Sequence, residues 1–213
     1  MTHRKLFIAG ASGATGQQVV SQALARKIDI VPHYRPKRAA GTAALPPGAA
    51  ICELSDASAL EAAMRGCTTV LQLIGTMKKR FAQGDTYETS DIGTTRALVQ
   101  AAKAVGVDHV LVLSSTGAGH PRGAYLHAKA AAERIAQESG ISTTVFRPSL
   151  LVGGDRAPRL LATVLKPLLG NTRYGPITLE DLAAALLNVA LANAPLGVAL
   201  EGPSLFEQVS ARR

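Results

Sequence analysis

Short continuous apolar stretches alternate with longer amphipathic stretches along most of this chain. Continuous apolar strands such as Val110–Leu113 are typical of a parallel sheet that is covered on both faces. Regular alternation of strand and helix predicts right-handed crossovers and a doubly wound α/β fold. The predicted strands are Lys5–Ala9, Ile28–Tyr34, Ala50–Leu54, Thr69–Ile74, His109–Ser114 and Thr143–Arg147. The predicted helices between them are Thr15–Lys27, Ser58–Arg65, Tyr87–Val105 and Gly123–Ser139.

The pattern changes after Arg147, where prolines and paired glycines interrupt the regular alternation. A small helix is expected over Arg159–Leu169, and a final strand over Leu196–Glu201. Between them, Thr178-x-x-Asp181 precedes an apolar run and has the form of a capping box that opens a helix. We therefore expect one domain over residues 1–213, in which residues 148–213 form a small C-terminal lobe that contacts the substrate.

The composition is that of a globular protein, with 213 residues, 47% hydrophobic and 18% charged. No apolar run is long enough to cross a membrane, so no membrane association is expected. The first residues lead directly into a strand, which argues against a signal peptide and for a cytoplasmic protein. Cys52 and Cys67 lack metal-ligand or C-x-x-C spacing, and both are read as reduced packing residues. No metal site is expected.

The formal net charge of +8 raises the question of a nucleic-acid partner. The cations fall in short clusters without interleaved aromatic residues, so no stacking platform is visible and nucleic acid is not expected. One cluster, Lys78, Lys79 and Arg80, lies in the predicted loop Thr76–Thr86. We expect this loop to be mobile without ligand and to cover the site, where its cations attract an acidic substrate or partner. A solvated surface loop is the open alternative.

A glycine-rich segment, Gly10–Gly16, follows the first apolar strand and precedes a helical stretch. Its spacing is G-x-x-G-x-x-G. Glycines allow a sharp turn and the close approach of a pyrophosphate to the backbone. The free N–H groups at the following helix N-terminus then face the anion. The segment therefore predicts a dinucleotide site, the alternative being a tight turn with no ligand.

Tyr125 and Lys129 are spaced four apart in the fourth predicted helix, so both side chains project from one face. An ammonium group favours the phenolate of a neighbouring tyrosine, which makes Tyr125 a candidate acid/base for a carbonyl or carbinol oxygen. Lys129 can also donate hydrogen bonds to ribose hydroxyls. Ser115 closes the fifth strand at the edge where parallel sheets bind ligands. Its hydroxyl could orient the same oxygen, or it could only begin a loop. His120 and His127 are weaker candidates.

The chain resembles the short-chain dehydrogenase/reductase superfamily, and within it the atypical NAD(P)-binding branch of the Tat-interacting-protein-like and NmrA-like proteins. The segments that carry the resemblance are Gly10–Gly16, Leu73–Thr76, Val110–Ala118, Tyr125–Lys129 and Val145–Ser149. It implies a Rossmann-like fold and an NAD(P) cofactor. It covers most of the chain up to Gly154 and the remainder more loosely.

The resemblance also implies roles for particular residues. Ser115, Tyr125 and Lys129 match the catalytic set. Arg35, with Arg38 nearby, follows the second strand where NAD-preferring relatives often carry an acid, so NADP is expected over NAD. The other implied cofactor contacts are Gly10, Ser12, Gly13, Ala14, Thr15 and Gly16 in the phosphate loop; Glu53 and Leu54 near adenine, with Glu in place of the usual Asp; Leu73, Ile74 and Gly75 on the adenine-ribose side; and Pro148 and Ser149 near the nicotinamide. Asp91 stands where many relatives have an Asn.

These observations lead to the expectation of an NADP-dependent oxidoreductase acting on a small carbonyl or alcohol. Two alternatives stay open: an NADP(H)-binding regulatory or assembly protein without turnover, and a nucleotide-sugar epimerase or dehydratase. The substrate is a small molecule that the sequence leaves unnamed, because substrate contacts come from variable loops. The oligomeric state is equally open, a homodimer being one alternative.

Overall fold

The computed structural model describes residues 3–75, 86–154, 169 and 172–211. Its centre is a seven-stranded sheet in the order β3-β2-β1-β4-β5-β6-β9, in which all strand pairs are parallel. The strands are β1 Lys5–Ala9, β2 Asp29–Tyr34, β3 Ala50–Ile51, β4 Thr69–Gln72, β5 His109–Leu113, β6 Ser142–Arg147 and β9 Val198–Glu201. The strand order reverses between β1 and β4. In open α/β sheets, such a reversal leaves a crevice at the carboxyl ends of the strands.

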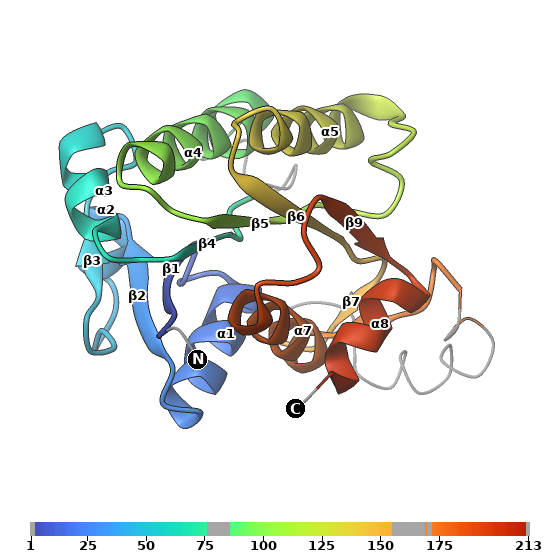
Figure 1. Cartoon of the computed structure of the whole chain (residues 1–213), viewed down its shortest axis with the longest axis horizontal. Helices are drawn as coiled ribbons and strands as arrows, with labels where there is room; N and C mark the ends of the chain where they lie inside the picture. The colour runs from blue at the N-terminus through green and yellow to red at the C-terminus, as the bar shows by residue number, and fades with distance from the viewer. Residues whose placement is uncertain (1–2, 76–85, 155–168, 170–171, 212–213) are drawn as a thin grey trace.

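Helices cover both faces of this sheet (Figure 1). The helices α3, α4 and α5 lie on one face, and α1, α7 and α8 lie on the other. Their bounds are α1 Ala14–Ala25, α3 Ala57–Met64, α4 Thr94–Ala104, α5 Gly123–Gln137, α7 Leu179–Ala192 and α8 Pro203–Ser210. Smaller elements are α2 Pro36–Ala39, the π-helix η2 Glu88–Gly93 and a separate parallel pair, β7 Leu151–Val152 with β8 Ile177–Thr178.

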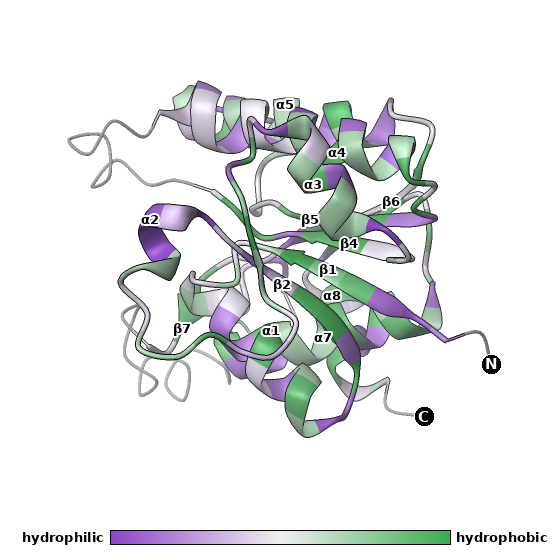
Figure 2. Ribbon diagram, turned by 90° about the vertical axis from the view of Figure 1, so that its left-hand side faces the viewer, coloured by the Kyte–Doolittle hydropathy of each residue, from purple (hydrophilic) through white to green (hydrophobic). Residues whose placement is uncertain are grey.

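Each face of the sheet has its own aliphatic core. Leu6, Ile8 and Leu111 face α1 and α7, whereas the alternating neighbours Phe7 and Val110 face α3 and α4. This alternation follows from the two-residue period of a strand. Because both faces are buried, the central strands carry consecutive apolar residues, which Figure 2 shows as green stretches of β1 and β2 between the helical layers. The predicted doubly wound parallel fold is confirmed.

Several predicted element boundaries differ from the structure. The helix predicted over Tyr87–Val105 is divided, since its first part is the π-helix η2 and only its second part is α4. The strand predicted over Ala50–Leu54 ends at Ile51. The short helices α2 and α8 and the β7–β8 pair were not predicted. The loop predicted over Thr76–Thr86, with its basic cluster, and the helix predicted over Arg159–Leu169 lie almost entirely outside the described residues.

The C-terminal segment contributes to both the sheet and its cover. Strand β9 pairs with β6, α7 packs against α1, and α8 packs against α7. Asn188 of α7 ties these three helices together, since it accepts a hydrogen bond from Arg26 (3.2 Å) and donates one to the Gln208 carbonyl (2.9 Å). Within the part of the chain that the structure describes, no helix has the length and apolar character needed to cross a membrane.

Candidate dinucleotide site

The phosphate loop joins β1 to α1 through a sharp glycine turn that lets an anion approach the backbone. Gly10 has a φ of +91°, which favours glycine, and the Gly13 N–H donates to the Gly10 carbonyl at 2.9 Å. Gly16 lies so close to this turn that an added Cβ would stand 2.1 Å from the Gly10 oxygen. Helix α1 starts directly after Gly13, so its first N–H groups are turned toward the space beyond the loop.

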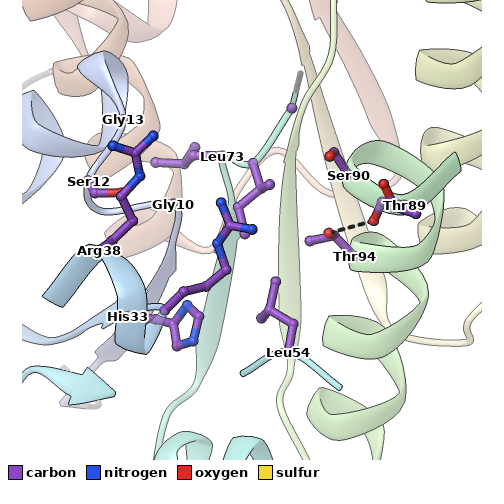
Figure 3. Close-up of a pocket in the computed structure, with 13 residues that line it drawn as sticks. Gly10, Ser12, Gly13, His33, Arg38, Leu54, Leu73, Thr89, Ser90 and Thr94 are labelled. Carbon is purple, nitrogen blue, oxygen red and sulfur yellow. Dashed lines mark hydrogen bonds between the residues drawn. The ribbon is translucent and has the colours of Figure 1, made fainter. Parts of the chain in front are cut away.

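A cavity of about 340 Å³ opens at this loop, at the carboxyl edge of β1, β2 and β4 (Figure 3). Its lining residues come from the phosphate loop, the end of β2 with α2, the segments that follow β3 and β4, η2 and the start of α4. They are Gly10, Ser12, Gly13, His33, Arg35, Arg38, Leu54, Leu73, Ile74, Gly75, Thr89, Ser90 and Thr94. The cavity thus gathers the loop, Arg35, Arg38 and the Leu73–Gly75 segment, which the sequence analysis had placed at one cofactor.

The end of the cavity near β2 is basic. Arg35 follows β2 directly, and Arg38 lies in the hydrophilic helix α2. Figure 3 shows the Arg38 guanidinium extending toward Ser12 and Gly13. No carboxylate is among the described residues that line the cavity. This end therefore presents positive charge to a bound anion without an acidic counter-group in the lining.

His33 is a lining residue that was not predicted from the sequence. It is buried at the end of β2, where its Nε2 lies 2.9 Å from the Cys52 carbonyl oxygen and its ring packs on Phe7. Burial lowers the pKa of His33, partly offset by the hydrogen bond to Cys52. The imidazole is therefore neutral at pH 7, and the two arginines supply the charge at this end of the cavity. Only the position of His33, two residues before Arg35, could have indicated it.

The opposite wall is formed by the end of β4 and the first turns after it. Leu73, Ile74 and Gly75 follow β4, and a Gln72 side chain bridges them to α4: its Oε1 accepts from the Ile74 N–H (2.5 Å), and its Nε2 donates to Thr95 (2.8 Å). Three hydroxyl residues complete the wall, Thr89, Ser90 and Thr94. They were not predicted from the sequence, although the Ser and Thr residues spread over η2 and the start of α4 were a detectable signal.

Lys129 lies beside this wall rather than in the cavity lining. Its Nζ is 2.8 Å from Asp91 Oδ1 and donates to the Leu113 carbonyl at 3.3 Å. A Cβ added at Gly75 would stand 2.6 Å from the same Nζ. Both partners of the ion pair are buried. The structure therefore places the Lys129 ammonium next to a cavity-lining glycine and pairs it with Asp91.

Tyr125 lies one turn before Lys129 on α5. The Lys129 Nζ is 6.0 Å from the centroid of the Tyr125 ring, and the Tyr87 ring packs against Tyr125 with 5.9 Å between the ring centroids. Tyr125 is half-buried. The phenol and the ammonium are thus neighbours on one helix face, as the spacing predicted, while the Tyr125 hydroxyl is not part of the described cavity lining.

The remaining predicted site residues follow β5 and β6 or lie outside the lining. Ser115 is half-buried just after β5. Pro148 and Ser149 follow β6; the Pro148 carbonyl accepts from the Thr116 N–H (2.9 Å), and the Ser149 hydroxyl donates to the Gly175 carbonyl (2.5 Å). Ala14, Thr15 and Gly16 lie in the first turn of α1, and Glu53 lies beyond β3. None of these residues lines the described cavity.

A second charge pair, between buried Glu133 of α5 and half-buried Arg147 of β6, lies one turn further along α5. Glu133 accepts from Arg147 Nε (3.0 Å) and Nη2 (2.5 Å), and the Ser114 hydroxyl donates to the same carboxylate. The Glu133 hydrogen bonds raise the pKa of Arg147 further. This cluster ties α5 to β5 and β6 and contains no cavity-lining residue. His120 and His127 are both exposed, and among the described residues no His, Cys, Asp and Glu side chains form a metal-binding group.

A parallel sheet with a strand-order reversal, a glycine loop at a helix N-terminus and a cavity between them define a dinucleotide-binding protein of the doubly wound class. The sequence match agrees with this class: residues 10–193 fit the model of the NAD(P)H-binding family, and the chain belongs to that family. The family expected from the motifs is thereby confirmed at the level of an NAD(P)-binding domain. No curated protein matches the sequence significantly.

Solved structures share the fold at low sequence identity. A short-chain dehydrogenase/reductase superfamily protein from Agrobacterium tumefaciens with bound NAD is 18% identical, with a TM-score of 0.69, covering 98% of this chain and 82% of that one. The NADPH-dependent quinone oxidoreductase QOR2 from Escherichia coli, complexed with NADPH, is 20% identical, with a TM-score of 0.67 and coverage of 92% and 68%. A nucleoside-diphosphate-sugar epimerase from Staphylococcus aureus is 19% identical, with a TM-score of 0.65 and coverage of 92% and 69%.

Proposed function

We propose that this protein is an NADP-dependent oxidoreductase that transfers hydride to or from a small carbonyl or alcohol. The observation that carries the proposal is the joint lining of one cavity by the phosphate loop and by Arg35 and Arg38. A dinucleotide whose pyrophosphate meets the α1 N-terminus has its adenosine ribose near the end of β2. Both arginines stand at that end, where a 2′-phosphate would lie. Solved structures of the same fold hold either NADPH or NAD, so the choice of NADP rests on these two arginines.

The cofactor preference can be measured by calorimetric titration with NADPH and NADH. A charge-assisted hydrogen bond contributes about 1.5–3 kcal/mol, so NADPH should bind about tenfold to a hundredfold more tightly than NADH. Arg35→Ala should remove most of that difference while leaving NADH affinity nearly unchanged. Arg65→Ala is the matched control, because Arg65 is exposed at the end of α3, at the amino edge of the sheet. Equal affinities for the two cofactors in the wild-type protein would refute the preference.

When bound in this cavity, NADPH would supply the hydride that reduces the carbonyl carbon, and it would leave as NADP. Tyr125 donates its phenolic proton to the carbonyl oxygen as the carbon–oxygen double bond becomes single, so charge and atoms balance in the alcohol product. The Ser115 hydroxyl hydrogen-bonds that oxygen and orients it. Lys129 stabilises the Tyr125 phenolate that remains and meets the cofactor ribose. The reverse sequence oxidises an alcohol with NADP.

Substituting Tyr125 by Phe tests this assignment, because it removes one oxygen and little packing. NADPH oxidation, followed by absorbance across a panel of aldehydes, ketones and quinones, should fall by about 10²–10⁴-fold while NADPH binding persists. His127→Ala, an exposed change on the same helix, is the control. Turnover that survives Tyr125→Phe would refute the proton-donor role.

A second candidate function is cofactor sensing without turnover. The observation in its favour is the Asp91–Lys129 ion pair, since it engages the ammonium that the reaction assigns to Tyr125 and the ribose. A sensor binds NADP(H) but transfers no hydride to any member of the panel. In a cofactor-bound crystal structure, its Tyr125 hydroxyl would point away from the nicotinamide, whereas the oxidoreductase requires the hydroxyl to face it.

A further inference from the structure

The pair formed by Asp91 and Lys129 joins two segments far apart in the sequence. Lys129 lies on α5, whereas Asp91 lies in the π-helix η2 that precedes α4. Their side chains are 8% and 1% exposed, and the Nζ–Oδ1 distance is 2.8 Å. An uncompensated charge at this depth would be costly, so each group offsets the buried charge of the other.

The local backbone brings Asp91 to this position. A π-helix inserts an extra residue into a helical turn, which rotates the side chains around it, and such insertions recur at functional sites. Here the Thr95 hydroxyl donates to the Asp91 carbonyl at 2.6 Å, and Gln72 donates to the same Thr95. The Gln72 side chain also accepts a hydrogen bond from the Ile74 N–H in the cavity wall. The segment that carries Asp91 is therefore tied to the wall of the cavity.

The ammonium is presented at that wall. The space that a side chain at Gly75 would occupy is taken by the pair: Lys129 Nζ lies 2.6 Å and Asp91 Oδ1 3.1 Å from the position of an added Cβ. Gly75 itself lines the cavity. The ammonium forms an ion pair with Asp91 and donates a hydrogen bond to the Leu113 carbonyl. An ammonium group carries three N–H donors, so it can also donate to a ligand that enters beside Gly75.

We infer that Asp91 is a positioning residue that holds the Lys129 ammonium at Gly75, where it meets the ribose of a bound dinucleotide. The inference rests on the proposed function, because it requires the cavity to bind NADP(H). It assigns Asp91 an effect on the cofactor that acts entirely through Lys129. An ion pair that only joined α5 to η2 could be replaced by apolar residues without loss, since a buried pair is weak support for stability.

A double-mutant cycle on NADPH affinity separates positioning from a structural role. The variants are Asp91→Asn, Lys129→Met and the double variant, titrated calorimetrically and unfolded in urea. Asp91→Asn should weaken NADPH binding about tenfold, the scale of one charged hydrogen bond. In the Lys129→Met background, the same Asp91→Asn change should leave NADPH affinity unchanged. Stability to urea should fall in both single variants and recover in the double variant, because no buried charge is then unpaired.

Two further variants add a conservative substitution of Asp91 and a control at a neighbouring ion pair. Asp91→Glu retains the charge but displaces the ammonium by one methylene, so it should also weaken NADPH binding; it serves if Asp91→Asn does not fold. Glu133→Gln is the matched control, since it breaks the neighbouring pair of Glu133 with Arg147, which includes no cavity-lining residue. Its effect on NADPH affinity should be the same with and without Lys129.

The outcomes are distinguishable. Wild-type protein that binds neither NADPH nor NADH refutes the proposed function, and the inference falls with it. Wild-type binding that Asp91→Asn and Asp91→Glu leave unchanged refutes the inference alone. An Asp91→Asn effect of equal size with Lys129 or Met at position 129 also overturns it, because Asp91 would then act through the fold. An effect seen only with Lys129 present supports it.

Discussion

At the scale of single residues, Gly16 is the position most tightly constrained by its surroundings. A Cβ there would stand 2.1 Å from the Gly10 oxygen and 2.8 Å from the Ala11 Cα, both rigid backbone atoms. Gly16→Ala must therefore open the phosphate loop or shift α1. We expect NADPH binding to be lost and the melting temperature to fall by several degrees, since a clash of this kind costs about 1–3 kcal/mol.

Two other glycines of the chain, Gly13 and Gly41, serve as comparisons for this prediction. A Cβ at Gly13 would stand 3.3 Å from the same oxygen, so Gly13→Ala should have a smaller effect on the melting temperature. At exposed Gly41 the nearest atom is 3.8 Å away, and Gly41→Ala should leave both binding and melting temperature unchanged. Calorimetry and thermal unfolding of the three variants give the ranking. A Gly16→Ala protein that melts and binds like Gly41→Ala would contradict the loop geometry.

At the scale of elements, helix α7 begins at the capping box that was predicted from the sequence. Thr178 accepts a hydrogen bond from the Asp181 N–H at 2.9 Å, which confirms the predicted cap. Thr178→Ala should lower the free energy of unfolding in urea by about 1 kcal/mol, because the first turn loses that acceptor. Thr178→Ser keeps the hydroxyl and should lose much less. Equal losses in the two variants would mean that the methyl group, and not the cap, is responsible.

Elements fixed by local pattern were predictable, and those fixed by distant contacts were not. Strand β1 and the start of α5 match the prediction because their apolar pattern and flanking glycines are local signals. The π-helix was missed because its buried residue Asp91 forms an ion pair with Lys129, which lies in another helix. Helix α8 was missed, although Gly202 followed by Pro203 is a readable helix start.

The residues of the candidate site also fall into two groups, those that a local sequence pattern predicted and those that depend on distant contacts. The phosphate loop was predicted from the spacing of its glycines, and Arg35 was predicted from its position directly after a strand. His33 and Thr94 were missed because they reach the cavity only through the packing of β2 and α4 beside it. The pairing of Lys129 with Asp91 likewise depends on how α5 lies against η2. Sequence patterns identified the ligand class but not the whole wall that receives it.

At the scale of the whole molecule, His109 links stability to pH. It is fully buried at the start of β5, with Nε2 2.9 Å from the Thr144 hydroxyl. Burial, with a smaller contribution from Arg4, lowers its pKa from 6.5 to about 4. Between these values the unfolded chain binds more protons than the folded one, so stability falls as the pH falls from about 6.5 to about 4. One such shift corresponds to about 3 kcal/mol.

Urea unfolding at pH 7 and at pH 4 measures this effect. The wild-type protein should lose about 3 kcal/mol more than His109→Gln over that interval, because glutamine does not titrate. His33 also has a lowered pKa but is present in both proteins, so the difference isolates His109. Parallel pH dependences in the two proteins would show that His109 is not the responsible group.

The packing of α7 on α1 has a consequence for how the chain is made. The described residues that line the cavity all fall between Gly10 and Thr94, but α7 begins only at Leu179. On the ribosome, α1 therefore emerges long before the helix that covers it. Until α7 arrives, Val19, Val20 and Ala23 lack their native cover. A nascent chain stalled in this interval carries a nucleotide-binding half with an open apolar face, the kind of intermediate that chaperones protect from aggregation.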